Sequence, residues 1–159
     1  MLSSKDIDNI SRKAIQQSSL EDKLSVLTHE TRRFGDSIGA MAAYFGITDS
    51  ANTYGLPNDF NKWAELLTRV TRDLHATLDT CLNTLRQQRG MIQQIDLEEL
   101  LSNLLFESHK TLDITKDATV FFTTINTEQI HGLHSDFSQW VERLVKVTQD
   151  YQRVLAMYD

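Results

Sequence analysis

An internal repeat constrains the fold of this chain more than any other sequence feature, because similar segments recur at a fixed spacing of 77 residues. The segment Leu56–Leu74 aligns without a gap with Leu133–Tyr151. Farther upstream, Leu20, Leu24 and Leu27 align with Leu97, Leu101 and Leu104. The identical pairs of the first alignment include Leu56/Leu133, Asp59/Asp136, Phe60/Phe137, Trp63/Trp140, Leu67/Leu144, Val70/Val147 and Thr71/Thr148. A repeat of this length indicates duplication of one structural unit.

Each repeat unit is predicted to be a helical hairpin, because its apolar residues recur at alternating steps of three and four. Trp63 and Trp140 fall in the same phase as Phe60 and Phe137, so we expect both indole rings to be largely buried. The predicted fold is all-α: an up-and-down four-helix bundle from two tandem-duplicated helical hairpins related by a pseudo-twofold axis, plus a short N-terminal helix.

The helix limits follow from capping signals. Ser18, Asn58, Asp96 and Ser135 are predicted N-caps, and Gly90 follows a helix end that carries Arg86. We therefore expect helices over residues 4–17, 19–47, 58–89, 96–124 and 135–158. In terms of domains, residues 1–159 are predicted to form a single domain with an N-terminal helix at 4–17, hairpin repeat one at 19–90 and hairpin repeat two at 96–159.

Composition limits the function classes that fit the chain. With 159 residues, one proline and 40% hydrophobic residues, a packed soluble domain is expected. The lone cysteine, Cys81, fits a reducing compartment, and we expect a cytoplasmic protein. A formal charge of −6 opposes generic binding to nucleic acid. Because no phosphate-binding loop or metal-ligand set stands out, we expect no cofactor, no metal site and no enzymatic activity.

The third long helix carries additional apolar residues that the first repeat lacks. Leu100, Leu105, Phe106 and Leu112 stand where the first repeat has Lys23, Thr28, His29 and Gly35. An apolar face of this kind is normally covered. Two alternatives remain for what covers this face: the N-terminal segment of the same chain, or a protein partner, which includes a second copy of the chain. These four residues are the predicted partner-binding site.

His29 lies in the string LTHETRRF, Leu27–Phe34. This string resembles the phosphoacceptor segment of bacterial sensor histidine kinases and phosphotransfer proteins, in which His-Glu is followed two residues later by Arg or Asn. The resemblance implies a helical hairpin with an exposed histidine that accepts a phosphoryl group. A solvated surface histidine is the alternative interpretation.

Two other groups of residues suggest sites. His131 and His134 lie near Asp136, but zinc requires three or four converging ligands, so we expect polar loop residues. A cluster of Arg69, Arg72, Arg86 and Arg89 would suit a peripheral membrane-binding scaffold, which the acidic charge disfavours. The preferred hypothesis is a non-enzymatic protein-interaction module (adaptor, scaffold or regulator). Histidine phosphotransfer through His29 is the first alternative, and membrane binding is the second.

Overall fold

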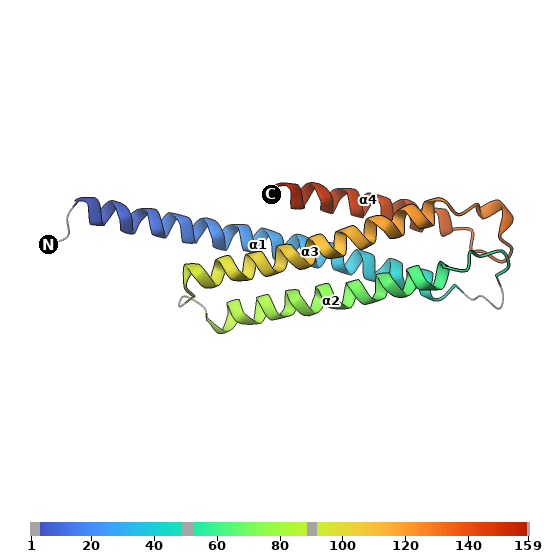
Figure 1. Cartoon of the computed structure of the whole chain (residues 1–159), viewed down its shortest axis with the longest axis horizontal. Coiled ribbons are helices and arrows are strands. Elements are labelled where there is room, and N and C mark those ends of the chain that lie inside the picture. Colours follow the sequence, from blue (N-terminus) through green and yellow to red (C-terminus); the bar gives the residue numbers. More distant parts are fainter. Residues whose placement is uncertain (1–3, 49–52, 89–91, 159) are drawn as a thin grey trace.

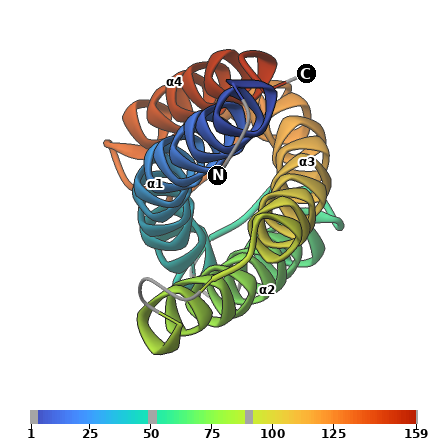
Figure 2. The same ribbon diagram turned by 90° about the vertical axis from the view of Figure 1, so that its left-hand side faces the viewer.

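The computed structural model describes residues 4–48, 53–88 and 92–158, with side chains of the first helix described from Ser19 onward. In these ranges the chain forms four α-helices that pack against one another as a bundle (Figure 1). Viewed along the bundle, α1 lies beside α4 and α2 beside α3 (Figure 2). The all-α prediction is confirmed. The elements are α1 (Ser4–Gly46), α2 (Phe60–Gln87), α3 (Gln94–Thr123), the 3-10 turn η1 (Thr127–Gln129) and α4 (Phe137–Ala156).

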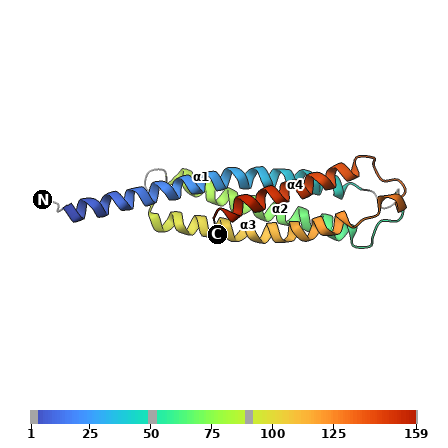
Figure 3. The same ribbon diagram turned by 90° about the horizontal axis from the view of Figure 1, so that it is seen from above.

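Helix α1 runs without interruption from Ser4 to Gly46, so the prediction of a separate helix at 4–17 with a break at Ser18 is wrong. The sequence has no glycine or proline between Ser4 and Phe34, and a serine inside a helix costs only about 0.5 kcal/mol relative to alanine. The first turns of α1 project beyond the end of the bundle (Figure 3).

The other helices begin close to the predicted positions but with different caps. Asp59 and Asp136 are the N-cap residues of α2 and α4, one residue after the predicted Asn58 and Ser135. Helix α3 begins earlier than expected, and its predicted cap Asp96 lies in the first turn, where a carboxylate interacts favourably with the helix dipole. Gly90 lies outside the described residues.

Four phenylalanines fill the bundle near the two hairpin loops. Phe45 and Phe122 stack with ring centroids 4.2 Å apart, and Phe60 and Phe137 pack on them. All four side chains are fully buried. The two tryptophans are only half-buried against this core, so the prediction that both rings are largely buried is wrong.

The loop between α1 and α2 and the loop between α3 and α4 pair through an isolated antiparallel bridge between Tyr54 and His131. The amide N–H of each residue donates to the carbonyl oxygen of the other, with both N···O distances 2.9 Å. The next residue in each loop is a glycine with positive φ, 93° at Gly55 and 84° at Gly132. Positions 77 residues apart therefore share the same backbone conformation here.

Hydroxyl side chains form part of the core midway along the helices. The Tyr151 hydroxyl donates to Ser108 Oγ at 2.8 Å and lies 2.8 Å from Thr31 Oγ1, from which it accepts. Its ring stacks on Phe34 with centroids 4.1 Å apart. Burial of these hydroxyls is tolerated because they satisfy one another.

Candidate partner-binding site

The structure separates the four predicted partner-binding residues. Phe106 is 72% exposed, whereas Leu100 and Leu105 are half-buried against the core. Leu112 is only 4% exposed, so its prediction as a surface residue is wrong. The reason is that Ser108 and Thr111 are buried beside Leu112. The buried face of α3 therefore includes hydroxyl residues and does not coincide with the positions that are apolar in the sequence.

A shallow groove runs between α2 and α3 beside Phe106. It consists of two hollows of about 330 and 200 Å³, both lined by Leu100 and Asn103. Leu104 and Cys81 line the larger hollow and are almost fully buried. We call this surface the α2/α3 groove. Its α2 side is lined by Thr77, Thr80, Cys81, Thr84 and Gln88.

A second exposed apolar residue extends the α3 side of the groove. Ile95 is 72% exposed, as is Phe106. The two residues are eleven positions apart, about three helical turns, and therefore share one side of α3. Two large apolar side chains thus stand in solvent on one side of α3, and of the two Phe106 lines the groove.

The charges that line the α2/α3 groove are all negative. Among the residues that the structure describes, its charged lining residues are Asp96, Glu99 and Glu107. None of them forms an ion pair with any residue that the structure describes. The groove between α1 and α4 differs, because Glu30 and Asp150 there accompany Arg33 and Lys146.

The Cys81 side chain is poorly suited to nucleophilic chemistry. The residue is 3% exposed, and burial raises the pKa of its thiol to about 11. The thiol is therefore protonated near neutral pH, and the thiolate is the reactive form. Cys81 contributes to the floor of the groove as a small apolar side chain.

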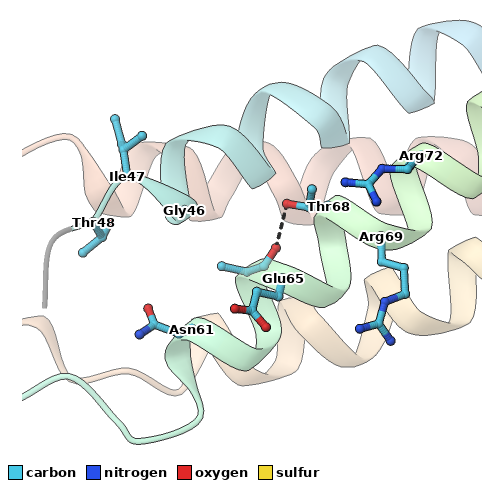
Figure 4. Close-up of a pocket in the computed structure, with 9 residues that line it drawn as sticks. Gly46, Ile47, Thr48, Asn61, Glu65, Thr68, Arg69 and Arg72 are labelled. Atoms are coloured by element: carbon cyan, nitrogen blue, oxygen red, sulfur yellow. Dashed lines mark hydrogen bonds between the residues drawn. The ribbon is translucent and has the colours of Figure 1, made fainter.

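A hollow of about 800 Å³, larger than the two hollows of the α2/α3 groove, lies between the end of α1 and the start of α2. Figure 4 shows that the guanidinium groups of Arg69 and Arg72 point in different directions and that the Glu65 carboxylate shares the hollow. These groups do not converge on one ligand atom. Arg86 is fourteen residues beyond Arg72, about 21 Å along the helix, and Arg89 lies outside the described residues. The structure therefore does not bring Arg69, Arg72 and Arg86 into one basic cluster.

A polar cluster that the sequence did not reveal joins α1 to the start of α4. The Tyr44 hydroxyl donates to Asp136 Oδ1 at 2.7 Å, and Trp140 Nε1 donates to Oδ2 at 3.3 Å. The rings of Tyr44 and Trp140 stack with centroids 4.7 Å apart. The Tyr44 hydrogen bond is the largest cause of a lowered Asp136 pKa, and burial raises the pKa of Tyr44 above its ordinary value. The sequence signals for this cluster were the identities of Asp136 with Asp59 and of Trp140 with Trp63, and neither indicated Tyr44.

His29 lies exposed on α1, as expected from its helical phase. His131 and His134 lie in the loop before α4, and among the described side chains no group of three or more His, Cys, Asp or Glu is placed to hold a metal ion. In the same ranges, none of the helices has the length and apolarity required to cross a bilayer.

The fold and the groove define an all-α helical bundle with one partly apolar, acidic surface groove. Comparison with family models, with curated proteins and with solved structures gives no match to this chain.

Proposed function

We propose that this chain is a non-enzymatic protein-interaction module, an adaptor, scaffold or regulator in the cytoplasm, that binds a partner through α3. The observation that carries the proposal is the exposure of Phe106 beside the half-buried Leu100 at the α2/α3 groove. Burying an exposed phenylalanine contributes about 1.5–3 kcal/mol before the entropic cost of association. Leu105 remains a candidate contact at the margin of this surface.

The course of α1 supports a partner in trans. The N-terminal segment was the other candidate to cover α3, but it continues α1 outward beyond the bundle (Figures 1 and 3). In this arrangement the N-terminal turns do not fold back along the bundle (Figure 3). A covering of the exposed Phe106 by another molecule fits this arrangement.

We further infer that the bundle consists of two tandem hairpins related by a pseudo-twofold axis. In its support, α2 and α4 begin at Phe60 and Phe137, and the two loops pair through equivalent residues. The partner surface would then be a specialisation of the second hairpin, because Phe106 stands where the first hairpin has His29.

The proposal is tested with Phe106→Glu. We expect this variant to lose proteins that co-purify with the wild-type chain, or to lose self-association, while helicity and unfolding temperature stay unchanged. Co-purification from native lysate, sedimentation velocity and circular dichroism provide the three measurements. Unfolding of the variant would instead place Phe106 in the monomer core.

Val120→Glu is the matched control, because Val120 is also an exposed apolar residue of α3, at 65%, and it does not line the groove. It should retain every partner of the wild-type chain. Equal loss in both variants would show that association depends on the general apolarity of α3, which contradicts a defined site.

Histidine phosphotransfer remains the second candidate, because His29 is exposed on the first helix of a four-helix bundle. This function requires that His29 become labelled by a phosphorylated receiver domain or a kinase and that His29→Gln abolish the label. Absence of labelling across a panel of such proteins would return His29 to an ordinary surface residue.

A further inference from the structure

The shape of the α2/α3 groove fits one kind of partner segment. From Asp96 to Glu107 the groove follows twelve residues of α3, a rise of about 16 Å, which equals about three turns of a helix. Its α2 side carries the short side chains of Thr77, Thr80 and Thr84, which leave room for close approach. An amphipathic helix laid lengthwise is a common occupant of such a groove.

The floor and edge of the groove supply apolar contacts for one face of that helix. Leu104 and Cys81 form the floor, Leu100 is half-buried between the two hollows, and Phe106 stands at the edge. Apolar side chains on a partner helix at steps of three and four would lie along this line.

The charged residues of the groove indicate which charge the polar face of the partner helix carries. Asp96, Glu99 and Glu107 line the groove without a basic residue among the lining side chains, and they form no ion pair within the described ranges. This negative character is local rather than a result of the net charge, because the α1/α4 groove has a balanced lining. Complementary positive charge suppresses wrong partners and accelerates encounter.

We propose that the α2/α3 groove binds a basic amphipathic helix of a partner protein. This inference rests on the proposed function and specifies the chemistry of the partner.

The test uses two fluorescein-labelled synthetic peptides of fourteen residues, with leucine at helical steps of three and four and either lysine or glutamate elsewhere. Fluorescence anisotropy measures their affinity for the full chain at low and high salt. We expect the lysine peptide to bind and the glutamate peptide to bind at least roughly tenfold more weakly. The Glu99→Lys/Glu107→Lys variant should weaken binding of the lysine peptide by roughly tenfold.

The matched control is Glu30→Lys/Asp150→Lys, which makes the same change of net charge in the α1/α4 groove. It should change the affinity less than about twofold, because these residues lie on the other side of the bundle. Equal weakening by both double variants would show attraction to the net charge alone and would overturn the proposal. Equal affinity for the two peptides would overturn it as well.

Two further measurements separate the possible failures. If Phe106→Glu weakens peptide binding but charge reversal does not, the groove is an interaction surface without preference for a basic helix, and only this inference fails. If neither variant has an effect, the proposed function fails at this surface too. If the wild-type chain is a dimer and the Glu99→Lys/Glu107→Lys variant is a monomer, the groove binds a second copy of the chain. If the wild-type chain binds anionic vesicles and this variant does not, the groove binds a membrane. Either result overturns the proposal.

Discussion

Gly55 is a residue at which the backbone permits no other side chain without strain. Its φ of 93° lies in the region that favours glycine, and a Cβ atom there would lie 2.6 Å from the backbone oxygen of Gln129. The neighbouring Tyr54 forms the bridge between the hairpin loops. A side chain at position 55 therefore disturbs the contact between the two halves of the molecule.

We expect Gly55→Ala to lower the free energy of unfolding by about 2 kcal/mol or more, because positive φ alone costs an alanine about 1–2 kcal/mol. Urea denaturation followed by circular dichroism measures the change. Gly46→Ala is the control, since no atom lies within 4 Å of its Cβ position, and it should be neutral or stabilising by up to about 1 kcal/mol. Equal destabilisation by the two variants would contradict the argument.

The sequence predicted individual core residues well where burial follows apolarity. The buried Phe60, Leu67 and Phe137 were all expected from their spacing. Leu112 was misplaced because its buried neighbours Ser108 and Thr111 are hydroxyl residues, whose burial an apolar pattern does not indicate. The tryptophans were misplaced because the helical phase predicts which side of the helix a side chain lies on, but not how deeply that side chain is buried.

At the scale of elements, Asp136 connects the start of α4 to α1 through Tyr44. The folded-state pKa of Asp136 is lowered, chiefly by this hydrogen bond, below the unfolded value of about 3.9. The associated stabilisation is therefore present above the unfolded pKa and is lost as the pH falls through the folded pKa.

Tyr44→Phe should raise the pKa of Asp136 toward its unfolded value and reduce the loss of stability between roughly pH 5 and pH 2. An NMR titration of the Asp136 carboxyl carbon and denaturation at several pH values check this result. Tyr158→Phe makes the same chemical change at a hydroxyl that donates to the Lys23 carbonyl, and it should leave the titration of Asp136 unchanged. An unchanged Asp136 pKa in Tyr44→Phe would refute this assignment of the hydrogen bond.

The approximate limits of α2, α3 and α4 were accessible from the sequence because periodicity extends over many residues. Continuity of α1 was not, since a serine that resembles a cap is also tolerated within a helix when no proline or glycine follows nearby. The α2/α3 groove was also inaccessible, because its α2 side is made of threonines that form no motif. Only the apolar Leu100 and Phe106 were recognisable in advance.

At the scale of the whole molecule, the bundle carries different surfaces on opposite sides, in the α1/α4 groove and in the α2/α3 groove. The α1/α4 groove has balanced charges, whereas the α2/α3 groove is acidic and has Phe106 at its edge. Substitutions of surface residues are sufficient for this difference, because the buried phenylalanines lie on all four helices. A binding function confined to the α2/α3 groove leaves these buried side chains unaffected.

The Tyr54–His131 bridge makes the association of the two halves observable in hydrogen–deuterium exchange. Each of the two amide protons is bonded to a carbonyl on the other hairpin, so neither hairpin alone protects them. We expect both amides to show the same protection factor, set by separation of the loops, whereas the amide of the exposed His134, which donates no backbone bond to the loop between α1 and α2, should be less protected. If exchange measured by NMR shows unequal protection of the Tyr54 and His131 amides, the two hydrogen bonds between the loops break separately.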